Sequence, residues 1–199
     1  SKRKHWDSKV RPDYRAVDNI EIKDKALKEL HSLGFTTAHL APDKGIFRGQ
    51  TGVISLSDQL NSINSSVAQV IDFKYRAKKN REYPRSLLGV IAHIRQIFYD
   101  SDWYLKAQEI VQSYPSENEP ISSNSSLESL GLSRALNKPF VFISTNDNSS
   151  SRAINIVKEF KLSPWILGSG SEYRVLDNFD EIKPFFIMPI NFPAKPNVT

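Results

Sequence analysis

The chain has 199 residues, of which 39% are hydrophobic, 11% aromatic and 25% charged, and this composition is ordinary for a globular protein with a sizeable core. It has no cysteine, which excludes disulfides and thiolate sites, and no apolar run approaches the roughly 20 residues of a membrane-spanning helix. The net charge of +5 raises the question of an anionic partner such as a nucleic acid.

The first third of the chain predicts a helix, a strand and a hairpin. Apolar residues at helical spacing follow Asp24, and Gly34 supplies a stop signal, so we expect a helix over 24–33 and a strand over 35–41. Residues 43–50 contain two glycines and are interpreted as a loop. Residues 53–56 and 67–75 are β-prone, and we expect them to pair as a hairpin with a long tip.

The middle of the chain contains a basic stretch and the clearest helical pattern. Apolar residues from Leu87 to Phe98 recur at helical spacing after Pro84, so a helix is expected from about residue 84 to 111. Residues 115–126 are rich in Ser, Glu, Asn and Pro and are expected to form a surface loop. The basic stretch is interpreted as a solvated connection between a strand and a helix; it contains Lys74, Arg76, Lys78, Lys79, Arg81 and Arg85.

The last third alternates helical and strand-like segments. Helices are expected over 127–136 and 172–179, with a third that is capped by residues 149–151 and extends to Phe160. Buried strands are expected between them. This alternation favours a parallel sheet with right-handed crossovers. The predicted fold class is therefore α/β, with a mostly parallel sheet, flanking helices and a β-hairpin. We expect at least four parallel strands, near residues 35–41, 140–144, 165–168 and 185–190.

The expected organisation is one α/β domain with short ends. Residues 1–20 are interpreted as an N-terminal extension, 21–193 as the domain and 194–199 as a tail. Within the domain, residues 21–114 and 127–193 are joined by the polar loop 115–126.

Ligands of parallel α/β sheets bind beyond the carboxyl ends of the strands, and here these ends carry small polar residues. The run from Gly168 to Ser171 follows a strand and precedes a short helix, which is the context of an anion site at a helix start. The run lacks the third glycine of a dinucleotide fingerprint and the Lys of a P-loop. A tight strand-to-helix turn is the favoured interpretation.

The four histidines are not spaced as metal ligands. None belongs to an HxH or HExxH pattern, and the chain has no GxSxG elbow for a nucleophilic serine. Each is interpreted as a hydrogen-bonded structural residue: His5 near the amino terminus, His31 on a polar helix flank, His39 in a strand and His93 beside the apolar stripe of the long helix.

Several stretches together resemble the amidohydrolase family, in its imidazolonepropionase-like branch. The two more specific ones are DKALKELHSLGFTTA at 24–38 and YPRSLLGVIAHIRQ at 83–96. The weaker ones are GIFRG at 45–49, KPFVFI at 138–143 and LGSGSEYRVL at 167–176. Residues 6–16 also fit a subgroup of large bacterial envelope proteins with amidohydrolase-like regions. The resemblance extends over residues 6–193.

The resemblance implies a distorted (β/α)8 barrel beside a β-sandwich. Active members hold zinc or another divalent metal that activates water to attack an amide or cyclic C–N bond. This chain departs from the family where metal ligands are expected, because Ile143 and Ser144 stand at one strand end and Gly168 and Ser169 at another. Such barrels need about 250 residues, so we expect an incomplete, TIM-like barrel that holds no metal or other cofactor itself.

Three functions stay open at this point. The favoured one is a non-catalytic amidohydrolase-like module of a larger hydrolase, with a cleft near Arg48, Asn146 and Glu172. The second is a fragment of an active metallohydrolase of C–N bonds whose remaining ligands lie outside the segment, and the third, disfavoured, is a basic nucleic-acid-binding module. The expected partners are the remainder of the parent polypeptide and a second copy of the chain, without a membrane span. Family analogy alone suggests the periplasm or cell envelope.

Overall fold

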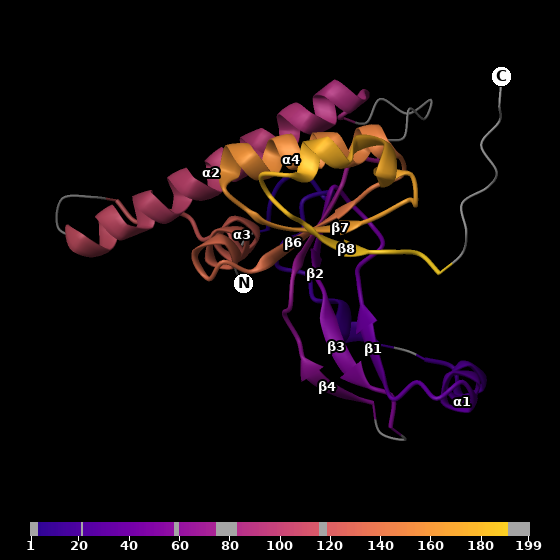
Figure 1. Cartoon of the computed structure of the whole chain (residues 1–199). Helices are drawn as coiled ribbons and strands as arrows, with labels where there is room; N and C mark the ends of the chain where they lie inside the picture. Colours follow the sequence, from indigo (N-terminus) through magenta and orange to yellow (C-terminus); the bar gives the residue numbers. More distant parts are fainter. Residues whose placement is uncertain (1–3, 21, 58–59, 75–82, 116–118, 191–199) are drawn as a thin grey trace.

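The computed structural model describes residues 4–20, 22–57, 60–74, 83–115 and 119–190. Two sheets organise this part of the chain (Figure 1). The larger sheet has five strands in the spatial order β2 (Phe47–Gln50), β5 (Gln69–Asp72), β6 (Pro139–Ile143), β7 (Ser163–Leu167) and β8 (Phe185–Ile187). The smaller sheet has three strands in the order β1 (Thr37–Leu40), β3 (Gly52–Ser55) and β4 (Asn61–Asn64).

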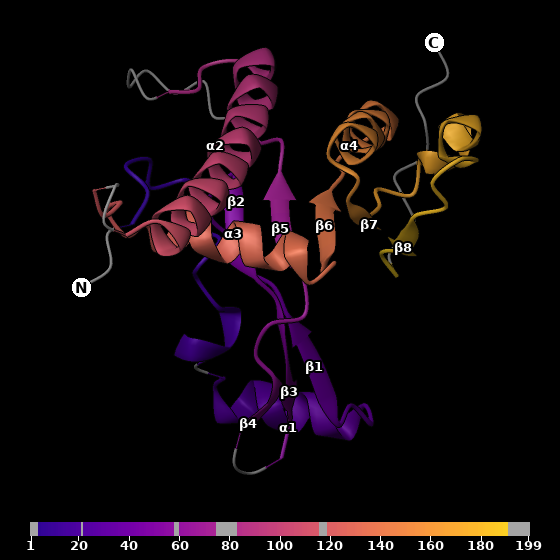
Figure 2. The same ribbon diagram turned by 90° about the vertical axis from the view of Figure 1, so that its left-hand side faces the viewer.

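The larger sheet is mostly parallel, as the alternation of elements predicts. Strands β5 to β8 are parallel neighbours in sequence order, and only β2 pairs antiparallel, with β5. Right-handed crossovers between successive parallel neighbours all fall on one face of a sheet. Figure 2 shows this arrangement, with three helices over the same face: α2 (Leu87–Ser113), α3 (Ser125–Ala135) and α4 (Asp147–Phe160).

The main core lies between this face and the helices. Phe98 of α2 stacks on Phe160 of α4 with ring centroids 4.6 Å apart, and it also meets Phe140 of β6 and Phe47 of β2. Full burial of each such side chain contributes about 1.5–3 kcal/mol. On the opposite face, Val70 and Val141 are buried with Ala68, and their apolar neighbours are only partly buried.

The N-terminal segment lies along the free side of β2. Val10 bridges Phe47, and Arg15 bridges Gln50, both in parallel orientation. Gly49 has φ +119°, and a Cβ atom there would lie 2.4 Å from the carbonyl oxygen of Tyr14. The prediction of a loop over 43–50 is therefore wrong for 47–50, because this glycine marks a close backbone approach within a strand and not a turn.

Two predicted strand pairings are also wrong. The segment near 35–41 does form a strand, but β1 pairs antiparallel with β3 in the smaller sheet and is not part of the parallel sheet. The hairpin expected between 53–56 and 67–75 does not form, because β3 pairs with β4 and β5 joins the larger sheet. Strand β4 is exposed along its whole length, so it lacks the apolar alternation that marks a half-buried strand.

The remaining predicted elements lie close to their expected positions. Helix α1 (Asp24–Ser32) forms with Lys23 as its N-cap, and α2 begins after Ser86, whose hydroxyl oxygen accepts the N–H of Gly89. The short helices are 3-10 turns, η1 (Ala16–Asn19) and η2 (Glu172–Phe179). Residues 76–81 of the basic stretch and the tail 194–199 lie outside the described residues. No helix within the described ranges is long and apolar enough to span a membrane.

Candidate functional site

A cleft of about 270 Å³ lies at the carboxyl ends of β5 and β6, and we refer to it as the edge cleft. Ligands of parallel sheets bind at this edge. The residues that line the edge cleft come from three places: the end of β5, the start of α2, and the connection from β6 into α4. They are Asp72, Phe73, Lys74, Leu87, Ile143, Thr145, Asn146, Ser149 and Arg152.

The carboxylate of Asp72 is fully engaged by neighbouring groups. Its Oδ2 atom forms an ion pair with Arg48 of β2, and its Oδ1 atom accepts the backbone N–H of Lys74 at 2.9 Å. The side chain of Asp72 is only 4% exposed, so its charge depends on the guanidinium for compensation. Both carboxylate oxygens accept hydrogen bonds, and the charge of Asp72 is compensated by Arg48 and not by a ligand of the cleft.

The cationic side chains of the edge cleft have no such compensation. Within the described residues, neither Lys74 nor Arg152 has an ion pair or a side-chain hydrogen bond. Asn146 caps α4, because its Oδ1 accepts the N–H of Ser149 at 2.9 Å. The amide nitrogen of Asn146 has no hydrogen-bond partner among the described residues. These groups favour an anion and not a metal cation.

On the side that faces β7, away from the edge cleft, the end of β6 is closed by a chain of hydroxyl groups. The hydroxyl of Ser144 donates to the carbonyl oxygen of Asn146 at 2.8 Å and lies 2.7 Å from the hydroxyl of Ser150. Ser150 in turn donates to Oε1 of Glu172 at 3.2 Å. Ser144 is 6% exposed and Ser150 is fully buried. The position where the family resemblance leads us to expect a metal-binding imidazole is thus occupied by a buried hydroxyl network.

The end of β7 is closed by Glu172. Its carboxylate accepts the backbone N–H groups of Ser169 and Gly170 at 2.7 and 2.9 Å, and the hydroxyl of Ser169 at 3.0 Å. A Cβ atom on Gly168 would lie 3.0 Å from Oε2, so the loop wraps tightly around the carboxylate. The backbone groups that would bind an external anion are therefore occupied, in agreement with the interpretation of this run as a tight turn.

The protonation of Glu172 reflects the same contacts. Burial alone raises the pKa of a carboxyl group, and Glu172 is 4% exposed. The hydrogen bonds from the backbone and hydroxyl of Ser169 and from the backbone of Gly170 act in the opposite direction and outweigh burial. The pKa of Glu172 consequently lies below its ordinary value, and the side chain is an anion at neutral pH.

The residues expected from sequence thus fall into two groups. Ile143 and Asn146 line the edge cleft, and Arg48 contacts it only through Asp72. The other expected residues belong to the closed end of β7 or to the hydroxyl network; they are Ser144, Gly168, Ser169 and Glu172. Sequence reasoning did not single out Asp72 or Arg152. The available signal for Asp72 was its place at the end of a β-prone run, and Arg152 had none.

The histidines lie away from the edge cleft. Nε2 of His93 is 2.9 Å from Oδ2 of Asp7, and both side chains are almost fully buried. His5 accepts the N–H of Asp7 on Nδ1, and burial lowers the pKa of His5. His31 contacts the carbonyl oxygen of Leu56 through Nε2, and the ring of His39 lies edge-on to Trp165, 6.2 Å away.

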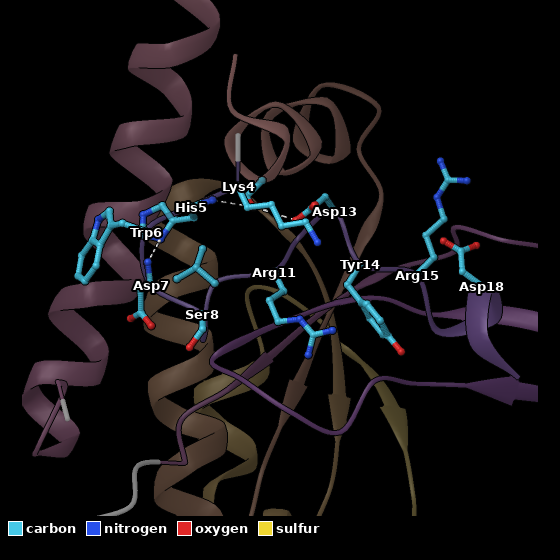
Figure 3. A pocket seen from close by; sticks show the side chains of 12 residues that line it. Lys4, His5, Trp6, Asp7, Ser8, Arg11, Asp13, Tyr14, Arg15 and Asp18 are labelled. Carbon is cyan, nitrogen blue, oxygen red and sulfur yellow. Dashed lines mark hydrogen bonds between the residues drawn. The ribbon is translucent and has the colours of Figure 1, made fainter. Parts of the chain in front are cut away.

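A second, larger cavity of about 530 Å³ follows the N-terminal segment (Figure 3). Its lining combines cations and carboxylates, and two of the carboxylates have local partners: Asp7 contacts His93, and Asp13 accepts the hydroxyl groups of Ser125 and Ser126. These contacts attach the segment to α2 and α3. The cavity lies beside β2, and not at the carboxyl edge of the parallel strands.

The described residues do not fit a zinc centre. Nowhere among them do three His, Cys, Asp or Glu side chains gather as a ligand set. At the ends of β6 and β7 the available atoms are hydroxyl groups and a carboxylate, which already bind one another. Zinc sites in proteins are built from three or four imidazole, thiolate and carboxylate groups, and the ends of β6 and β7 offer the single carboxylate of Glu172 among the described residues.

Comparisons with known proteins identify a solved structure with a similar fold. No family model matches the chain, and no curated protein does. The structure is similar to the crystal structure of an amidohydrolase from Thermotoga maritima, with a TM-score of 0.72 and 19% identical residues. The fold is amidohydrolase-like. The match covers 84% of this chain but 45% of the other, so the amidohydrolase-like chain spans less than half the length of the structure that it matches.

Proposed function

We propose that this chain is a non-catalytic amidohydrolase-like module that forms one part of a (β/α)8 barrel in a larger envelope protein. The observation that carries the proposal is the closure of the ends of β6 and β7 by their own side chains. Ser144 stands at one position where the family resemblance leads us to expect a metal ligand, and its hydroxyl contacts Ser150. Ser150 donates to Glu172, which binds the backbone of its own loop. In the amidohydrolase mechanism the metal activates the attacking water, so loss of the metal ligands would remove that nucleophile.

The arrangement of the larger sheet supports the barrel. Sequential parallel strands with helices on one face form the wall of a (β/α)8 barrel, whose other face points into the barrel interior. That face here carries Trp165, Leu167 and Ile187, which are only partly buried. Phe185, at the edge strand β8, is 61% exposed. Further strands from the remainder of the parent polypeptide would bury these side chains.

The test is the metal content of the full-length protein after loading with zinc and removal of free metal. We expect far less than one zinc per chain, measured by elemental analysis, and no hydrolysis of amide or cyclic amide substrates. The proposal fails if one zinc is retained and is lost in Glu172→Gln or Asp72→Asn while the control Glu181→Gln keeps it. Glu181 suits the control because it is exposed and pairs only with Lys158.

A further inference from the structure

We infer that the edge cleft binds a compact organic anion through a phosphate or carboxylate group. The cleft lies between the carboxyl ends of two adjacent parallel strands, which is where sheets of this kind bind ligands. The inference concerns binding only. It does not rest on the proposed absence of catalysis, since the residues that it uses differ from Ser144, Ser150 and Glu172.

The charge balance of the cleft selects for an anion. Arg48 neutralises Asp72, so Lys74 and Arg152 leave two positive charges without a counter-charge among the described residues. A charged hydrogen bond from Lys or Arg to a carboxylate or phosphate is roughly twice as strong as a neutral one. The next carboxylate along α4, Asp147, is not among the residues that line the cleft.

A neutral donor adds to the two cations. Oδ1 of Asn146 accepts both the N–H and the hydroxyl of Ser149, at 2.9 and 3.0 Å. The opposite end of this amide is therefore the NH₂ group, which has no hydrogen-bond partner among the residues that the structure describes. An anion held by Lys74 and Arg152 would give this donor an acceptor.

The walls and the size of the cleft define the rest of the ligand. Phe73 is 5% exposed, and Leu87 and Ile143 are half-buried, so the cleft combines an apolar wall with a cationic rim. Its volume of about 270 Å³ is just below the range of about 300–1,000 Å³ for ligand pockets. A small metabolite with one anionic group and an apolar body fits this combination.

The experiment is a calorimetric titration of the full chain at low ionic strength with three probes: inorganic phosphate, acetate and benzoate. We expect saturable binding of at least one probe with a dissociation constant near or below about 1 mM, and weaker binding as salt is added. Lys74→Met and Arg152→Met should each weaken it about tenfold, as the loss of a charged hydrogen bond implies. Phosphate binding alone would assign a phosphate ligand, and tighter binding of benzoate than acetate would assign an apolar carboxylate.

The matched control is Lys158→Met, because Lys158 lies on the same helix but pairs with Glu181 away from the cleft. It should leave binding unchanged, and circular dichroism verifies that all variants fold. The inference is overturned if none of the probes binds at about 10 mM, or if binding persists in the double variant K74M/R152M. It is also overturned if a single-stranded oligonucleotide binds far more tightly than phosphate and only variants at 76–81 weaken it.

Discussion

The carboxyl ends of β5 and β7 belong to one sheet, but their acidic side chains have opposite roles. At β5, Asp72 is neutralised by an arginine from the neighbouring strand, and uncompensated cations remain beside a cleft. At β7, Glu172 binds the backbone of its own loop and closes the strand end. An acidic residue near a strand end therefore indicates a ligand site only when neighbouring polar groups of the protein are left without a hydrogen-bond or ion-pair partner. Here that condition holds at β5 and not at β7.

The largest effect is expected at the β5 end. Arg48→Met removes the partner of a carboxylate that is 4% exposed, and leaving such a charge uncompensated costs about 3–5 kcal/mol. The free energy of unfolding, from urea denaturation, measures this loss. The double variant R48M/D72L removes both charges and should recover most of the stability. An equal loss in both variants would show that the ion pair is not what makes Arg48 important.

The next largest effect is expected at the β7 end. Glu172→Gln keeps the size of the side chain but replaces an anion that accepts two backbone N–H groups and two hydroxyl groups. Charged hydrogen bonds are worth about 1.5–3 kcal/mol each, so we expect a loss of about 2–3 kcal/mol in the same denaturation experiment. Glu181→Gln, on an exposed ion pair, should leave the free energy of unfolding almost unchanged.

The stability difference between the natural chain and Glu172→Gln should depend on pH. The folded-state pKa of Glu172 is below the ordinary value of about 4.5 for a glutamate, so its contribution to stability is fully present above that value. As the pH falls through the folded pKa, the contribution is lost. The stability difference between the natural chain and Glu172→Gln should therefore be constant near neutral pH and shrink below about pH 4.5. A difference that grows on acidification would contradict the assignment.

A smaller effect on stability is expected for the hydroxyl network that joins the carboxyl ends of β6 and β7. Ser144→Ala removes a hydrogen bond to the carbonyl oxygen of Asn146 and a contact with Ser150, and it should cost about 1 kcal/mol. Thermal unfolding suffices to measure it. A neutral result would mean that water replaces the hydroxyl and that the end of β6 is more open than the contacts indicate.

The smallest effect on stability is expected for the cations of the edge cleft. Arg152→Gln breaks no ion pair or hydrogen bond among the described residues, so the free energy of unfolding should change by less than about 0.5 kcal/mol. Anion binding should nevertheless weaken. A large loss of stability would assign Arg152 a structural role and remove it from the binding argument.

Periodicity predicted the helices and the parallel strands of the last third, because buried strands and amphipathic helices have different apolar spacings. It could not assign β1 to the smaller sheet, since a four-residue strand carries no record of its partner. It also missed β2, because a glycine at position 49 favours a loop. In the structure Gly49 allows the backbone of Tyr14 to approach the strand closely. In both cases the local sequence pattern does not record which segment the strand pairs with or packs against.

The site was less accessible from sequence than the fold. Glu172 was placed in a cleft because it follows a strand, but three residues of spacing let its carboxylate fold back onto Ser169. The pair of Arg48 and Asp72 joins residues 24 positions apart, and only the antiparallel register of β2 and β5 brings them together. Which polar groups remain unpaired is a property of the folded chain, and this property separates the two strand ends.

Amide hydrogen exchange can show whether the carboxylate of Glu172 closes the end of β7. The N–H groups of Ser169 and Gly170 should exchange slowly in the natural chain, and in Glu172→Gln their exchange should speed up by a larger factor than that of the helix amides of α4. If both loop amides exchange at the rate of an open loop in the natural chain, the strand end is accessible and the account is wrong.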